Sequence, residues 1–206
     1  MPTLLQLDSS PLETAVSREL TREFVNTWKN AHPQGTVIYR DLAVTPNKPL
    51  DAQWIFSVFT PDSVRTPEQQ AALTLSDKLI AELEKADEYV IGVSMHNFTI
   101  PGTLKLWLDQ IIRKDQTFTY GAAGPQGLLT GKKATFLVAT GGIYELGTPA
   151  GAYNFIEPYL KTVFGFLGVT DTTFVTAGGT QKLMSPDADR AAFLQPKLEQ
   201  VRELVA

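Results

Sequence analysis

Cysteine is absent from this 206-residue chain, and histidine occurs only twice. Without cysteine the protein forms no disulfide and has no thiolate nucleophile, so any redox chemistry has to come from a bound cofactor. Two histidines are too few for a histidine-rich metal site, and we predict that no metal is bound.

Strong charge of one sign and long hydrophobic runs are also missing. Eighteen Lys and Arg against 22 Asp and Glu give a net charge of −4, which creates no basic field to attract nucleic acid or an anionic membrane. No segment approaches the roughly 20 apolar residues of a membrane span. Residues 1–8 also lack the basic start and longer apolar segment of a secretory signal. We therefore expect a cytoplasmic protein with no nucleic-acid or membrane partner.

Short β-like runs alternate with amphipathic helices along the chain. The five predicted strands are Leu4 to Leu7, Val37 to Tyr39, Tyr89 to Val93, Ala134 to Ala139 and Thr172 to Thr176. Apolar residues recur at spacings of three and four in two predicted helices, at Val16, Leu20, Phe24 and Trp28 and again at Ala72, Leu75, Leu79 and Leu83.

Start signals mark the helices. Thr66 as N-cap, Pro67 at the first helical position and Gln69 three residues after the cap predict where the second helix begins. The later helices are predicted to open at Pro101, to span Tyr153 to Phe166, and to follow Ser185-Pro186-Asp187. This alternation implies right-handed crossovers and predicts an α/β fold, a flavodoxin-like doubly wound five-stranded parallel sheet of order 2-1-3-4-5 with helices on both faces.

Two segments depart from the simple alternation, within what we expect to be a single domain over residues 1–206. The excursion at about 42–66 is long and apolar for a connection, so it should cover another surface. It contains Pro46, Pro49, Pro61, Trp54, Phe56 and Phe59. The second excursion, at about 117–132, has four glycines and is interpreted as a mobile segment near the site.

Hydroxyl-bearing residues follow the first predicted strand. Backbone amides at a helix N-terminus, together with Ser10 and Ser17, can hold a phosphate without any lysine. The alternative is that the serines and threonines of this segment only cap the helix and form the turn. The glycine-rich patterns of dinucleotide and P-loop sites are both missing there.

The third predicted strand leads into Met95-His96-Asn97-Phe98. Ligands of open parallel sheets bind beyond the carboxyl ends of the strands, and this loop offers an apolar surface and an amide to a flat heterocycle such as a flavin. Met95 and Phe98 could instead fill the core and Asn97 form a turn. His96 could be an ordinary exposed turn residue.

Ala139-Thr140-Gly141-Gly142 follows the fourth predicted strand. Glycines allow a ligand to approach the backbone closely, although a plain strand-to-helix turn would use the same residues. In the predicted strand order, the three loops converge on one crevice, and this convergence favours a ligand site.

The chain resembles the FMN-dependent NADH:quinone oxidoreductases of the azoreductase type. The resemblance begins at Ser10 and Ser17, and Met95-His96-Asn97-Phe98 stands where the family typically has Met-Tyr-Asn-Phe. It continues through the glycine-rich segment 117–133, Gly141-Gly142 and the segment 158–168, so it covers nearly the whole chain.

The resemblance implies a homodimer with one FMN per subunit near the interface, where Trp54 to Phe59 would form part of the interface and pocket wall. The phosphate would contact Ser10, Ala15, Val16 and Ser17, and the ring would contact residues 95–98 and 139–142. Tyr144 or His96 could assist protonation. NADH would give a hydride to FMN and leave, after which a quinone or aromatic azo compound would take two electrons in a ping-pong sequence.

The match has two departures. Relatives often have Ser-Gln-Ser where this chain has Ala15-Val16-Ser17, which removes one hydroxyl and one amide from the phosphate turn. His96 replaces a tyrosine. Two other functions remain open, an FMN-binding electron carrier or regulatory module without its own substrate, and a nucleotide-binding domain that uses no flavin.

Overall fold

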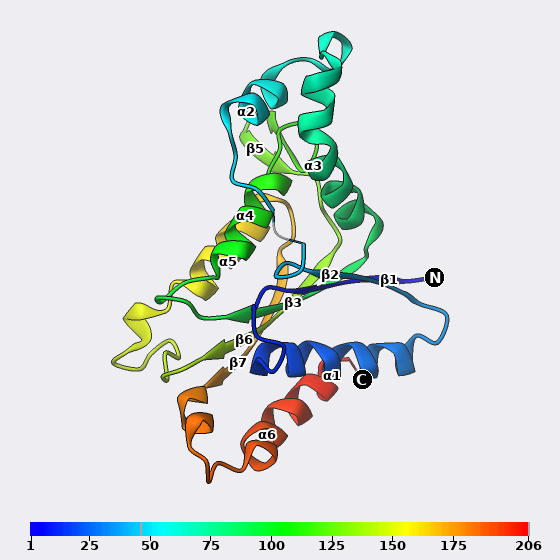
Figure 1. Ribbon diagram of the computed structural model, residues 1–206. Coiled ribbons are helices and arrows are strands. Elements are labelled where there is room, and N and C mark those ends of the chain that lie inside the picture. The colour runs from blue at the N-terminus through cyan, green and yellow to red at the C-terminus, as the bar shows by residue number, and fades with distance from the viewer. Residues whose placement is uncertain (46, 206) are drawn as a thin grey trace.

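The computed structural model describes residues 1–45 and 47–205, so Pro46 of the first predicted excursion lies outside the described residues. Five parallel strands form the central sheet in the order β2-β1-β3-β6-β7 (Figure 1). They are β1 (Thr3–Asp8), β2 (Thr36–Asp41), β3 (Glu88–Ser94), β6 (Lys133–Thr140) and β7 (Asp171–Gly178). The predicted flavodoxin-like order 2-1-3-4-5 is confirmed, since these are the first to fifth strands of the sheet along the chain.

Helices cover both faces of the sheet, as predicted. In Figure 1, α1 and α6 lie against one face, and α3, α4 and α5 lie against the other. Their bounds are α1 (Val16–Ala31), α3 (Pro67–Lys85), α4 (Gly102–Ile111), α5 (Ile156–Phe166) and α6 (Arg190–Glu203). None of the helices that the structure describes is both long and apolar enough to cross a membrane.

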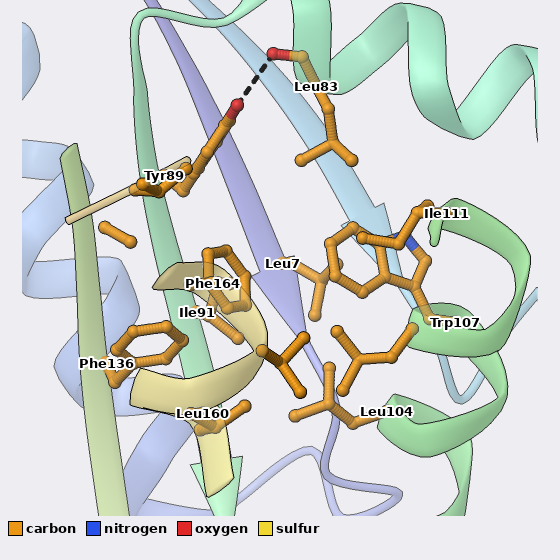
Figure 2. Close-up of a cluster of buried hydrophobic side chains, with 14 of the residues drawn as sticks. Leu7, Leu83, Tyr89, Ile91, Leu104, Trp107, Ile111, Phe136, Leu160 and Phe164 are labelled. Carbon is orange, nitrogen blue, oxygen red and sulfur yellow. Dashed lines mark hydrogen bonds between the residues drawn. The ribbon is translucent and has the colours of Figure 1, made fainter. Parts of the chain in front are cut away.

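Two hydrophobic cores follow from this layering, one on each face of the sheet. The larger contains Trp107 of α4 and Phe164 of α5 packed onto the strands (Figure 2). Burying a side chain of this size stabilises the fold by roughly 1.5–3 kcal/mol. The buried hydroxyl of Tyr89 donates to the backbone carbonyl of Leu83 at 2.9 Å, so this polar group is hydrogen-bonded within the core.

The second core lies under α1, where the predicted spacing of apolar residues is confirmed. Leu20, Phe24 and Trp28 are buried and join Leu4 and Val90 of the sheet in one cluster. The start of α3 is also confirmed. Thr66 and Gln69 form a capping box there, and Pro67 is the first helical residue.

One predicted helix start was wrong by a few residues. Tyr153 belongs to a short 3-10 helix, η2 (Gly151–Tyr153), and α5 starts only at Ile156. The reason is Asn154, whose side-chain oxygen accepts hydrogen bonds from the first backbone N–H groups of α5. The last helix follows Ser185-Pro186-Asp187, as predicted, and starts at Arg190, where Asp189 caps it by accepting a hydrogen bond from the N–H of Ala192 at 2.9 Å.

Both predicted excursions contain regular structure that the sequence did not reveal. In the first, Asp51 caps the helix α2 (Ala52–Phe59), and Trp54 is buried while other aromatic side chains stay exposed. A 3-10 helix, η1 (Asp62–Val64), follows it. The second excursion forms an antiparallel hairpin of β4 (Phe118–Gly121) and β5 (Gly124–Gly127).

Candidate functional site

The three predicted loops meet at the carboxyl edge of the sheet and are hydrogen-bonded to their neighbours. The hydroxyl of Ser9 donates to the carbonyl of Gly92 at 2.6 Å, and Thr103 at the start of α4 donates to the carbonyl of Ser9 at 2.9 Å. The N–H of Met95 donates to the carbonyl of Ala139 at 2.8 Å. The loops after β1, β3 and β6 are therefore neighbours, as the strand order requires.

The first loop presents the N-terminus of α1 without a side-chain cap. Ala15 occupies the N-cap position and makes no side-chain hydrogen bond, in contrast to Thr66 at the start of α3. The first N–H groups of a helix have no acceptor within it, so those of Val16 and Ser17 suit an anion. Ser10 and Ser17 are both buried next to this helix start.

Gly92 explains why α1 lies so close to β3. A Cβ at this position would lie 2.8 Å from Asp8 Oδ1, 2.9 Å from Thr21 Cγ2 and 3.2 Å from the carbonyl oxygen of Ser17. Only glycine leaves room for this approach. The hydroxyl oxygens of Ser17 and Ser94 then lie 3.1 Å apart.

The second loop is a tight turn held in a sparsely populated conformation. His96 and Thr99 exchange two backbone hydrogen bonds of 2.9 and 3.1 Å. Asn97 and Phe98 between them have positive φ values of 48° and 73°. Asparagine tolerates this region, but phenylalanine is strained there, and such strain concentrates at functional sites. Met95 packs against the larger core, whereas His96, Asn97 and Phe98 are exposed.

Phe98 belongs to an aromatic cluster at the mouth of the site. Its ring centroid lies 5.3 Å from that of Tyr153 and 6.0 Å from that of Tyr144, the latter edge to face. The backbone N–H of Phe155 donates to the carbonyl of Phe98 at 3.1 Å. The loop before α5 therefore supports the turn after β3, and Phe98 remains 44% exposed.

The third loop turns its carbonyls inward and leaves one side open. Gly142 accepts hydrogen bonds from the N–H of Gly179 and the hydroxyl of Thr140. A Cβ on Gly141 would meet no heavy atom within 4 Å. Packing within the chain does not require glycine there, which fits a surface that a ligand approaches closely.

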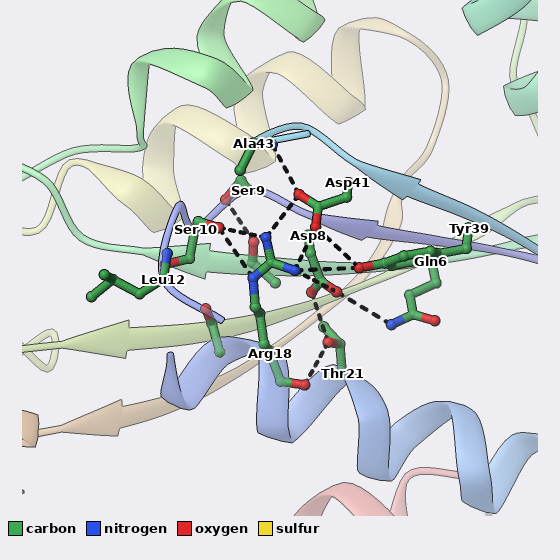
Figure 3. A network of polar contacts seen from close by, with 12 residues as sticks. Gln6, Asp8, Ser9, Ser10, Leu12, Arg18, Thr21, Tyr39, Asp41 and Ala43 are labelled. Atoms are coloured by element: carbon green, nitrogen blue, oxygen red, sulfur yellow. Dashed lines mark hydrogen bonds and ion pairs between the residues drawn. The ribbon is translucent and has the colours of Figure 1, made fainter. Parts of the chain in front are cut away.

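A charged network stabilises the first loop from the side of β2 (Figure 3). Arg18 forms two hydrogen bonds with the carboxylate of Asp41, both 2.7 Å long, and this contact lowers the pKa of Asp41. Burial raises the pKa of Asp8, although Thr21 donates a hydrogen bond to it. Desolvation of its hydroxyl and the nearby carboxylates of Asp8 and Asp41 raise the pKa of Tyr39 to about 12, so this phenol stays protonated at neutral pH.

Two hollows in the surface, one of them beside the first loop, lie away from residues 95–98 and 139–142. One hollow of about 410 Å³ is lined by Asp8, Arg18 and Tyr39 beside the first loop. Another of about 530 Å³ lies between α2 and α3. Within residues 1–45 and 47–205, no group of three or more His, Cys, Asp or Glu side chains is arranged to hold a metal ion.

Comparison with known proteins assigns the family. Residues 2–204 match the model of the Flavodoxin_2 family, described as a flavodoxin-like fold. This chain belongs to the Flavodoxin_2 family. A curated relative, the FMN-dependent NADH:quinone oxidoreductase of Acidobacterium capsulatum, is 62% identical over 206 residues, which is the full length of both chains.

Solved structures of other proteins share the same arrangement. The azoreductase of Bacillus anthracis str. Sterne superposes with a TM-score of 0.88 at 29% identity, covering 100% of this chain and 99% of that one. An FMN-dependent NADH-azoreductase of Bacillus anthracis str. Ames Ancestor, solved in complex with FMN, gives a TM-score of 0.86 at 26% identity and covers 98% of this chain and 97% of that one.

Several residues at the site of this Flavodoxin_2 protein were missed by sequence reasoning. Arg18, Asp41 and Tyr153 were not singled out, although Arg18 contacts the predicted site residue Ser10, Tyr153 contacts the predicted site residue Phe98, and Asp41 binds Arg18. A signal existed for the first pair, since Arg18 directly follows Ser17 and Asp41 ends the strand next to β1. No pattern in the sequence indicated Tyr153, which reaches Phe98 only through the fold.

Proposed function

We propose that this protein is an FMN-dependent oxidoreductase that takes a hydride from NADH and passes two electrons to quinones or aromatic azo compounds in a ping-pong sequence. One observation carries the proposal. The uncapped start of α1, the strained turn at Asn97-Phe98 and the open backbone at Gly141 lie on three neighbouring loops. The full-length similarity to a protein named as an FMN-dependent NADH:quinone oxidoreductase supports the same reading.

The donor set of the first loop fits a phosphate. We propose that Ser10 and Ser17 donate their hydroxyls and that Ala15, Val16 and Ser17 present their backbone to it. The turn has no side-chain cap of its own, so an anion would satisfy N–H groups that the helix leaves free. The chain lacks two polar side chains at Ala15 and Val16 that relatives often have, and backbone donors would carry more of the binding.

The other two loops fit a flat ring. We propose that Met95, His96, Asn97 and Phe98 lie along one part of it, and that Ala139, Thr140, Gly141 and Gly142 approach another part. Bound FMN would supply the hydride and electron transfer, while the chain binds, orients and desolvates the reactants. The rings of Phe98 and Tyr153 would keep water from the reacting face.

We propose that polar side chains next to the flavin ring supply the protons. Tyr144 follows the open glycines and packs its ring against Phe98, so its hydroxyl is available to a bound quinone. His96 is exposed on the turn after β3. We propose assistance by one of these two, with neither being indispensable, because most of the catalysis would come from placement.

We further propose that the single-domain chain works as a homodimer in the cytoplasm, where NADH is available. The exposed rings of Phe56 and Phe59 on α2 support the dimer, since they are 70% and 77% exposed in the isolated subunit. Exposed apolar clusters of this kind mark contact surfaces. We propose that this face packs near the flavin site of the partner and completes its wall.

A spectroscopic experiment tests the function. Purified protein is reconstituted with FMN, and its visible spectrum is recorded before and after anaerobic NADH, then after a simple quinone or an azo dye. We expect a bound flavin spectrum that NADH bleaches and the acceptor restores. Bound flavin that NADH leaves unchanged would point to a carrier or regulatory module, and protein that binds no FMN would refute the proposal.

The dimer has its own test. Sedimentation of the wild-type chain should give a mass near twice that of one subunit. Phe56→Glu should shift it toward the monomer, because a charge would be buried in the contact. Val44→Glu is a matched control, since Val44 is also exposed but lies outside α2. A monomeric wild type would contradict the dimer while leaving the assignment of FMN open.

A further inference from the structure

We propose that Arg18 is a positioning residue for the flavin phosphate, which it serves by clamping the backbone of Ser10 rather than by contacting the phosphate. The inference rests on the proposed function and adds to it a residue pair, Arg18 and Asp41, that lies behind the expected phosphate loop. The five N–H groups of the Arg18 guanidinium decide between positioning the loop and binding the phosphate directly.

Two of the donors of Arg18 hold the phosphate loop itself. Nε and Nη2 donate to the carbonyl oxygen of Ser10 at 3.1 and 2.7 Å (Figure 3). The side chain is buried, with Arg18 only 8% exposed. Two charge-assisted bonds to one carbonyl fix the orientation of that peptide, and with it the direction in which the Ser10 side chain leaves the backbone.

The remaining donors anchor the clamp to β2. Nη1 and Nη2 each donate to one oxygen of Asp41 at 2.7 Å, and Nη1 also donates to the hydroxyl of Tyr39 at 3.3 Å. Asp41 is itself fixed, because its carboxylate accepts the N–H of Ala43 at 2.9 Å. The guanidinium thus ties the loop after β1 to the end of the neighbouring strand.

This use of donors distinguishes positioning from direct binding. An arginine has five N–H donors, and here all five point to acceptors within the protein. None is left for a phosphate oxygen. The positive charge is also balanced by Asp41, whose pKa is lowered by this contact. Asp8 lies 3.9 Å from Nη1, which adds a second carboxylate to the cluster.

A planar fork is required for this geometry. Lysine would keep the charge, but its single ammonium cannot bridge the carbonyl of Ser10 and both oxygens of Asp41 at once. Glutamate in place of Asp41 would keep its charge as well, while moving the carboxylate by one methylene. Both changes should let Ser10 shift, and a shift of the phosphate donors should weaken binding of the phosphate and spare binding of the ring.

The test therefore compares two flavins that differ only in the phosphate. Dissociation constants of FMN and riboflavin are measured by flavin fluorescence for the wild type, Arg18→Lys and Asp41→Glu, after circular dichroism has verified folding. We expect the affinity for FMN to fall about tenfold or more in both variants, and the affinity for riboflavin to change by less than about twofold. Asp41→Glu carries the test if Arg18→Lys does not fold.

Arg22→Gln is the matched control. Arg22 lines the same hollow as Arg18 but is exposed, so this variant removes a nearby charge without releasing Ser10. Its affinity for FMN should stay within about twofold of the wild type. Equal loss of FMN and riboflavin in the two clamp variants, or no loss of either, would overturn the inference. Failure of the wild type to bind FMN would instead refute the proposed function.

Discussion

The hydroxyl oxygens of Ser17 and Ser94 lie 3.1 Å apart and join the first turn of α1 to the carboxyl end of β3. Each hydroxyl has one proton, and the pair uses only one of the two. The other proton remains available to an acceptor outside the pair. Because Ser17 is fully buried beside the uncapped start of α1, an oxygen of a phosphate in the first loop is a suitable acceptor.

Ser17→Ala should weaken binding of FMN by about tenfold, because the proposed charge-assisted hydrogen bond from Ser17 to the phosphate would be lost. The matched variant is Ser94→Ala, which breaks the same serine pair but leaves the hydroxyl of Ser17 free to donate. Its affinity should change by no more than about threefold. Fluorescence titration with FMN measures the affinities of both variants. Equal effects of the two substitutions would mean that only the pair matters and that Ser17 does not bind the phosphate.

The turn at Phe98 should respond differently to glycine and to alanine. With φ at 73°, alanine retains the left-handed penalty, whereas glycine removes it. Phe98→Gly should therefore be more stable than Phe98→Ala by about 1 kcal/mol in urea unfolding, even though both lose the ring. Both variants should reduce kcat/KM by about tenfold or more, since the contacts of the ring with Tyr144 and Tyr153 are lost.

Tyr153 supplies the control for the effect of conformation. Its backbone lies in the 3-10 helix η2 and outside the left-handed region, so glycine has no conformational advantage there. Tyr153→Gly should be less stable than Tyr153→Ala, the reverse of the order at Phe98. If the same substitution, glycine or alanine, gave the more stable variant at both positions, this would contradict the idea that strain is stored in the turn after β3.

Much of this fold was predictable because the signals are local. Strands of the sheet were found from short apolar runs, and the start of α3 from Thr66, Pro67 and Gln69, since each signal lies within a few residues of the element that it defines. The hairpin of β4 and β5 has four residues in each strand, too few for a period to emerge. It depends on a distant segment, because Gly127 packs directly against Gly168.

For the candidate site, the meeting of the three loops was predictable from local signals. Its loops follow strands, so their positions were available once the strand order was inferred. The pairing of Arg18 with Asp41 was not available, because the two residues are 23 positions apart and meet only when β2 is in register with β1. The contact of Phe98 with Tyr153 likewise depends on how the loop before α5 returns over the sheet.

Asp8→Asn should stabilise the protein at neutral pH. Burial raises the pKa of Asp8 in the folded chain above its ordinary value of 3.8, so the folded state binds the proton more tightly than the unfolded state. The stability that this carboxyl contributes is complete below pH 3.8 and is lost as the pH rises through the folded pKa. In urea unfolding at pH 7, the free energy of unfolding of Asp8→Asn should be higher than that of the wild type, and this difference should shrink as the pH is lowered.

Asp41→Asn should behave in the opposite way. Its pKa is lowered, chiefly by the hydrogen bond from Arg18, so its contribution is present above pH 3.8 and is lost as the pH falls through the folded pKa. The free energy of unfolding of Asp41→Asn should be lower than that of the wild type at pH 7, and this difference should shrink as the pH falls.

The Asp8 prediction has its own contrary outcome. If Asp8→Asn were less stable than the wild type at pH 7, the attraction between Asp8 and Arg18 would contribute more to stability than the burial of the Asp8 carboxylate costs.

Gly127→Ala should loosen the hairpin from the body of the protein. A Cβ at this position would lie 2.1 Å from the backbone nitrogen of Gly168, far inside any real contact, so the two segments must separate. We expect a loss of about 1–3 kcal/mol or more in the free energy of unfolding. Gly121→Ala is the control within the same hairpin, since its Cβ would come no closer than 3.7 Å to another residue. Its stability should change by less than about 0.5 kcal/mol, and equal losses in the two variants would mean that the approach of Gly127 to Gly168 does not hold the hairpin in place.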